Sequence, residues 1–147
     1  MNTPKLSLGM AGLGFGALLV LMTPAQADTV SFKASLSGAA EVPPADTKAS
    51  GTLTATYDTS TKQLSYTVDY SGLSGPATGA HFHGPADAGQ NAGVAVPLAA
   101  PLTSPVKGAA TLNDAQANDL MAGKWYLNIH TATNKGGEIR GQLEKAK

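Results

Sequence analysis

Hydrophobic and polar residues alternate with a period of two along most of the chain, which predicts half-buried β-strands. The clearest alternating stretches are 30–36, 52–57, 63–70, 125–130 and 139–143. Residues 79–83 are also expected to form a strand, and weaker strand candidates are 94–98 and 106–112. Seven or eight short strands with turn signals between them are typical of an all-β antiparallel Greek-key sandwich or barrel.

One short helix interrupts the predicted strands. Asn113 is a good N-cap, Gln116 stands at the capping-box position, and Gly123 ends the segment after Leu120 and Met121. A helix of this length cannot form a layer of its own. We therefore expect it to be a crossover between two strands of one all-β domain.

Residues 1–27 have the pattern of a signal peptide. Lys5 supplies a positive start, residues 6–22 carry no charge, and Ala25-Gln26-Ala27 is a small-x-small cleavage pattern. The uncharged run is shorter than the roughly 20 apolar residues that a membrane span needs. We expect cleavage after Ala27 and export to the periplasm or out of the cell. Residues 28–147 then form a single domain without a membrane span.

Charge and composition exclude several functions. The 147-residue chain has 10 Lys and Arg against 10 Asp and Glu, so no basic excess is available to neutralise nucleic acid phosphates. It has no cysteine, which rules out disulfides, a thiol nucleophile and a thiolate metal site.

The three histidines form the most informative pattern in the chain. His81 and His83 are two apart on a predicted strand, so they share one face with Cα atoms about 6.5 Å apart. His130 ends another predicted strand, on the face opposite Trp125. If these strands are neighbours, the three imidazoles meet outside the core. Three imidazoles without a carboxylate suit copper or zinc best, and histidines that only stabilise a polar strand face are the ordinary alternative.

Other polar residues could complete such a site. Asp87, Asn128 and Glu138 are candidate fourth ligands or partners of the ligands, and the loop 86–93 could lie over the histidines. Arg140 shares an outward face with Glu138, where an exposed ion pair is the ordinary interpretation. Its functional alternative is an anion guide beside a metal.

Four sequence motifs, in order, resemble those of the CHRD domain, the module named after chordin. They are Gly38-Ala39-Ala40-Glu41-Val42-Pro43-Pro44, the segment 70–76, Ala80-His81-Phe82-His83-Gly84-Pro85-Ala86, and the closing segments 125–132 and 136–143. In chordin the domain accompanies growth-factor-binding modules in an extracellular protein. The resemblance therefore implies an interaction module with an envelope or extracellular protein partner, which needs no metal.

A looser resemblance concerns the histidines. The order of His81-Phe82-His83, a Gly-rich loop, His130, and a Gly-Gly turn before Arg140 is similar to that of the copper ligands and active-site arginine of copper/zinc superoxide dismutases. It implies copper at His81, His83 and His130, with Arg140 attracting a small anion, on an immunoglobulin- or superoxide-dismutase-like fold. The chain lacks a bridging fourth histidine and the usual cysteines. The resemblance thus supports a copper site more than it supports dismutation.

Three hypotheses follow from the sequence. The first is an exported protein that binds copper as a carrier, a buffer or a redox site. The second is a metal-free interaction module, and the third is a superoxide-dismutase-like enzyme. Whether the protein is an enzyme stays open at this stage.

Overall fold

The computed structural model describes residues 27–147, so the predicted signal peptide lies outside the described residues except for Ala27. No helix within this range is long and apolar enough to cross a membrane. In chain order the elements are β1 (Thr29–Ser37), the 3-10 helix η1 (Gly38–Ala40), β2 (Ser50–Asp58), β3 (Gln63–Ser71), β4 (Ala77–His83), β5 (Val94–Pro97), β6 (Val106–Thr111), α1 (Asp114–Met121), β7 (Tyr126–Thr131), β8 (Ile139–Gln142) and β9 (Glu144–Lys145).

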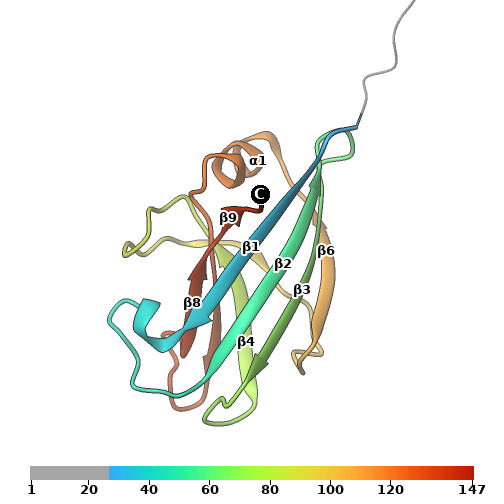
Figure 1. Ribbon diagram of the computed structural model, residues 1–147. Helices are drawn as coiled ribbons and strands as arrows, with labels where there is room; N and C mark the ends of the chain where they lie inside the picture. The colour runs from blue at the N-terminus through green and yellow to red at the C-terminus, as the bar shows by residue number, and fades with distance from the viewer. Residues whose placement is uncertain (1–26) are drawn as a thin grey trace, which may run out of the picture.

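The strands form one antiparallel, nearly closed barrel (Figure 1). Their order is β5-β4-β7-β8-β1-β2-β3-β6, and the short β9 pairs with β1. Strands β1, β2 and β3 pair along their whole length, so Val30 lies opposite Tyr57, which lies opposite Leu64. The predicted all-β antiparallel fold is confirmed.

Some connections of the chain join strands that are not neighbours in the barrel. Strands β3 and β4 are consecutive in the sequence but far apart in the sheet order, and the same holds for β6 and β7. The connection from β6 to β7 contains α1, which lies at one end of the barrel (Figure 1). Its capping box is formed as predicted, since Asn113 and Gln116 each accept a hydrogen bond from the other's backbone nitrogen. Gln116 also donates to the Ala95 carbonyl, which ties the helix to β5.

The inward faces of the strands supply the core. The alternation of apolar residues places one large side chain from almost every strand inside, where each contributes about 1.5–3 kcal/mol through burial. The largest fully buried side chains include Trp125, Phe32, Phe82, Leu53, Leu64, Leu127 and Ile139. The predicted apolar stripe Trp125, Leu127 and Ile129 is thus confirmed as core, so the alternate residues of β7 face outward.

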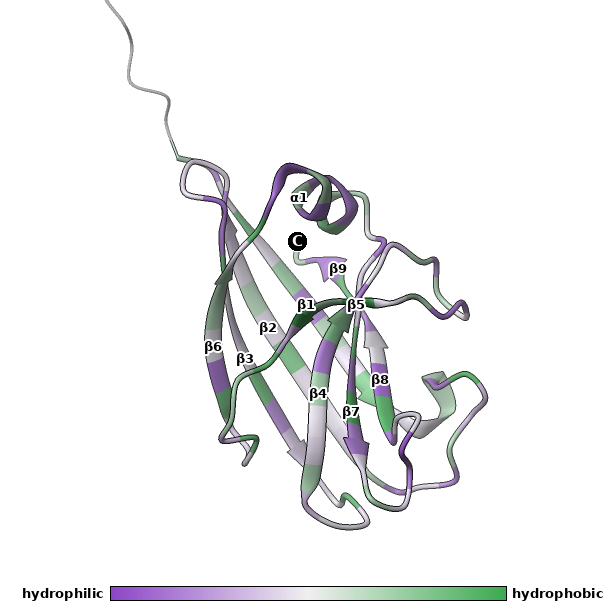
Figure 2. Ribbon diagram, turned by 180° about the vertical axis from the view of Figure 1, so that it is seen from behind, coloured by the Kyte–Doolittle hydropathy of each residue, from purple (hydrophilic) through white to green (hydrophobic). Residues whose placement is uncertain are grey.

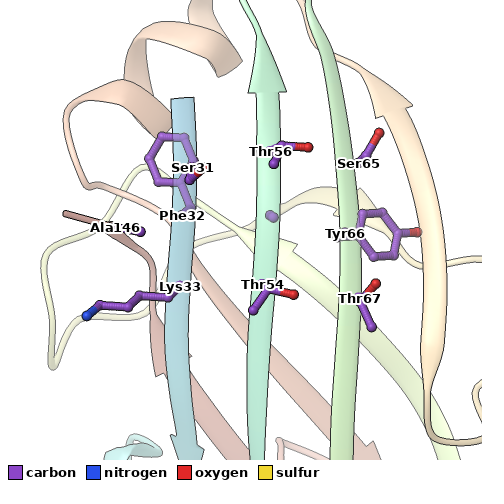
Figure 3. Close-up of a pocket in the computed structure, with 10 residues that line it drawn as sticks. Ser31, Phe32, Lys33, Thr54, Thr56, Ser65, Tyr66, Thr67 and Ala146 are labelled. Atoms are coloured by element: carbon purple, nitrogen blue, oxygen red, sulfur yellow. The ribbon is translucent and has the colours of Figure 1, made fainter. Parts of the chain in front are cut away.

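The outward face of β1, β2 and β3 is rich in hydroxyl groups. A hollow on this face is lined by Ser31, Lys33, Thr54, Thr56 and Thr67, among others (Figure 3). The histidines are not among its lining residues, because they belong to strands β4 and β7. This hollow therefore plays no part in the candidate site.

Candidate metal centre

Strands β4 and β7 are direct neighbours, and this brings the three histidines together. Figure 2 shows these two strands side by side with β8 beyond them. Gly79 pairs with His130, His81 with Asn128, and His83 with Tyr126. Paired residues share one face of a sheet, so all six lie on the face opposite Phe82 and Leu127. The predicted neighbourhood of His130 with the other two histidines is confirmed.

The three imidazoles converge closely enough to hold one ion. One nitrogen from each ring lies within 4.8 Å of those of the other two. His81 Nδ1 is 3.1 Å from His130 Nε2. Asn128 Oδ1 lies 2.9 Å from His83 Nε2 and 2.9 Å from His130 Nε2. Asn128, one of the three candidate fourth ligands or partners of the ligands, therefore lies within the cluster.

Backbone carbonyls fix the tautomers of two histidines. His83 Nδ1 lies 3.0 Å from the Ala92 carbonyl oxygen, and His130 Nδ1 lies 2.8 Å from that of Lys135. A carbonyl oxygen can only accept, so each Nδ1 carries the proton and donates it. In the neutral rings, each Nε2 then turns a lone pair toward Asn128.

The orientation of the Asn128 amide is also fixed. Its Nδ2 donates to the Gly136 carbonyl oxygen and faces the carboxyl group of Glu41. Because both of these neighbours have oxygen acceptors, the amide oxygen of Asn128 must point at the two histidine nitrogens. The centre of the cluster is therefore lined by lone pairs. A proton on His81 Nδ1 would form a hydrogen bond to His130 Nε2. The contact between His83 Nε2 and Asn128 Oδ1 would still have no proton between its two acceptors.

Burial keeps two of the histidines uncharged. His83 is buried, while His81 and His130 are half-buried. Burial lowers the pKa of His81, and the neighbouring His130 and His83 lower it further. Burial also lowers the pKa of His83, outweighing its hydrogen bonds to Ala92 and Asn128. Neutral imidazoles are the form that binds a metal ion.

Two glycines leave room around this cluster. A Cβ atom on Gly79 would lie 3.1 Å from Cε1 of His81. Gly137 has a φ of +131°, and a Cβ there would lie 2.3 Å from Glu41 Oε1 and 2.7 Å from Asn128 Nδ2. Gly137 therefore needs a residue without a side chain where Glu41 meets Asn128, whereas a Cβ on Gly79 would press against the His81 ring.

Glu41 is a buried carboxyl group behind the cluster. It is 5% exposed, and its Oε1 has no hydrogen-bond partner among the described residues. Burial raises the pKa of Glu41 to about 7, although the charge of Arg140 and the amide of Asn128 act against this rise. The group is therefore only about half ionised at neutral pH.

Arg140 lies on the same wall and is 2% exposed. Its Nη1 donates to Asn91 Oδ1 at 2.9 Å, and its Nη2 donates to the carbonyl oxygen of Gln90. Its guanidinium carbon is 3.4 Å from the ring centre of Tyr126. The Tyr126 ring is in turn stacked on His83, with centres 4.8 Å apart and planes within 4° of parallel. The predicted cover by the loop 86–93 is confirmed through these contacts and the Ala92 carbonyl.

Two further residues named by the sequence have other partners. Glu138 is fully buried and accepts hydrogen bonds from Thr47, Ser74 and Thr131. Burial raises the pKa of Glu138, but these hydrogen bonds outweigh it and lower the pKa to about 2. Asp87 forms an exposed ion pair with Lys124. The expectation of an exposed ion pair between Arg140 and Glu138 is thus wrong. Both side chains are buried, and they have different partners.

Sequence reasoning missed the roles of Glu41 and Tyr126. Glu41 lies between η1 and β2, so nothing local indicates that it reaches β7. Tyr126 directly follows Trp125 in the sequence. The period-two pattern shows only that these two aromatic side chains face opposite sides of the strand. Its outward face gave the only available signal, since it shares that face with His130.

Comparisons with known proteins place the chain in one family. Neither a search of curated proteins nor a search of solved structures found a match. The family model of the CHRD domain matches residues 32–143, a range that begins in β1 and ends beyond β8. This range includes the three histidines, Asn128 and Arg140. Since the match covers more than half of the sequence, the chain belongs to the CHRD domain family.

Proposed function

We propose that this protein binds one copper ion through His81, His83 and His130. The observation that carries the proposal is the set of lone pairs around Asn128 Oδ1. Two backbone carbonyls and the fixed amide direct nitrogen and oxygen lone pairs of His83, His130 and Asn128 at one another, at 2.9 Å. Such contacts are unfavourable in the absence of a cation, whereas a metal ion would use every one of them.

The chemistry of the donors favours copper over other metals. Imidazole nitrogens suit copper, zinc, nickel and iron, and copper binds most tightly among the divalent ions of this series. The Nδ1–H groups of His83 and His130 donate to backbone carbonyls, which is the usual support of a metal-bound imidazole. Asn128 is placed to act as a weak fourth ligand or to orient the two rings. Zinc is the second choice.

The proposed site of action is outside the cytoplasm. The pattern of residues 1–27 supports export with cleavage after Ala27, to the periplasm or beyond the cell. Copper binding in such a compartment requires no thiolate, in agreement with a chain that has no cysteine.

The test is a titration of the untagged protein with Cu(II), Cu(I) and Zn(II). A tag must be avoided because added histidines bind the same ions. The chain has only three histidines, so imidazole nitrogen couplings in the electron spin resonance spectrum of the Cu(II) form report on this site alone. We expect one copper per chain, and we expect His81→Ala and His130→Ala each to weaken binding at least about 100-fold.

Asp87→Asn is the control, because Asp87 is exposed and paired with Lys124 outside the cluster. It should bind copper as the wild type does. Copper affinity that survives both histidine substitutions would contradict the proposal. A wild-type protein indifferent to all three ions would favour a metal-free interaction module. Superoxide turnover by the copper-loaded protein would add the dismutase-like activity that the sequence resemblance implies.

A further inference from the structure

A buried positive charge lies beside the proposed copper site. Arg140 stacks on Tyr126 at 3.4 Å, and Tyr126 stacks on His83 with ring centres 4.8 Å apart. Together these separations keep the guanidinium carbon within about 8 Å of the centre of the His83 ring, a distance at which charges still interact strongly inside a protein. We infer that Arg140 biases this site toward Cu(I) over Cu(II) through its charge. The inference rests on the proposed copper site and names the oxidation state that it favours.

The charge of Arg140 is poorly compensated. The acceptors of its terminal nitrogens, Asn91 Oδ1 and the Gln90 carbonyl oxygen, are both uncharged. Glu41 is the carboxyl group that interacts electrostatically with Arg140, but the two side chains form no ion pair. Water cannot screen the guanidinium well, because the residue is 2% exposed.

The donors add no negative charge at the site itself. Three neutral imidazoles and the Asn128 amide leave the full charge of the ion in place. Repulsion from Arg140 is twice as large for a dication as for a monocation at the same position. For one charge about 8 Å away and an effective dielectric constant near 20, the difference corresponds to about 30-fold in the ratio of the two affinities.

Arg140 also has a structural connection to the site. Its hydrogen bonds to Gln90 and Asn91 hold the loop whose next residue, Ala92, accepts from His83. A substitution can therefore change copper binding by moving this loop. Movement of the loop and loss of charge must be separated by the choice of variants.

The experiment compares Cu(I) and Cu(II) dissociation constants, measured by competition with a chelator for each ion, and reports their ratio. We expect Arg140→Gln to shift the ratio about 30-fold toward Cu(II). Arg140→Lys keeps the charge and should stay within about twofold of the wild type. Lys135→Gln removes the charge of an exposed residue whose backbone carbonyl accepts from His130, and it should also change the ratio less than about twofold, because water screens that charge.

Glu41→Gln supplies a variant of opposite sign. It removes the carboxyl group that interacts with Arg140, so it should shift the ratio toward Cu(I). This variant also decides the question if Arg140→Gln does not fold. Equal shifts in Arg140→Gln and Arg140→Lys would overturn the inference, as would a Glu41→Gln shift toward Cu(II) or none at all. A wild-type protein that binds no copper would instead contradict the proposed function.

Discussion

His81 Nδ1 lies 3.1 Å from His130 Nε2, although the two residues are 49 positions apart in the chain. The antiparallel pairing of β4 with β7 produces this contact, because His130 is opposite Gly79, two residues before His81. The site is thus built on two adjacent strands of a packed barrel. Loops contribute mainly the carbonyl oxygens that orient the rings.

Asn128→Ala should weaken metal binding about 10–100-fold, the usual effect of losing a group that orients metal ligands. The substitution removes the oxygen that lies 2.9 Å from both His83 Nε2 and His130 Nε2. Isothermal titration with Cu(II) and Zn(II) measures the change. Asn118→Ala on the exposed side of α1 is the control. Equal affinities of the Asn128 and Asn118 variants would show that the amide has no part in binding.

Gly79→Ala should reduce metal affinity several-fold without a comparable loss of stability. The new Cβ would lie 3.1 Å from His81 Cε1 and 3.4 Å from His81 Nε2, so the ring must shift by a few tenths of an ångström from its present position. Gly75→Ala is the matched control, since a Cβ there has no heavy atom within 4 Å. Titration and urea unfolding of both variants give the two quantities. A Gly79→Ala protein with unchanged affinity would mean that the His81 ring need not hold this position.

Glu138 makes the stability of the fold depend on pH in the acid range. Its folded pKa of about 2 is below the ordinary 4.5, so the folded state favours the ionised form. The stabilisation is complete above about pH 4.5 and is lost as the pH falls toward 2. Glu138→Gln should cost about 2 kcal/mol at pH 7, since it weakens hydrogen bonds to a buried charge.

Urea midpoints of wild type and Glu138→Gln, measured between pH 7 and pH 3, test this prediction. The difference between the two proteins should shrink as the pH is lowered. Glu144→Gln, at an exposed position of β9, is the control and should follow the wild type throughout. A difference that stays constant with pH would mean that the Glu138 charge does not stabilise the fold.

Glu41 should make the stability of the fold depend on pH in the direction opposite to that of Glu138. Its folded pKa of about 7 is above the ordinary 4.5, so the folded state binds the proton more tightly than the unfolded chain does. This contribution to stability is complete below about pH 4.5 and is lost as the pH rises through 7. Relative to the wild type, metal-free Glu41→Gln should therefore be more stable at pH 8 than at pH 5. Thermal unfolding at the two pH values measures this, and a relative stability that is the same at both would contradict it.

The period-two alternation determined the strands and which side chains enter the core. It placed Phe82 inside and His81 and His83 outside from local sequence alone, because successive residues of a strand face opposite sides. The capping box of α1 was readable for the same reason, since Asn113 and Gln116 satisfy each other's backbone within one turn. Residues within a few positions of one another carry this information.

Only the tertiary structure decided how the outward face of β7 is enclosed. Alternation makes Tyr126, Asn128 and Arg140 appear solvent-exposed, yet all three are buried. The segment that holds Glu41 and the loop that holds Asn91 meet this face from distant parts of the chain. The hydrogen bonds of Arg140 to Asn91 and Gln90 alone span 49 and 50 residues. Local patterns state which way a side chain points but not what covers it, and the tautomer of His83 depends on that cover.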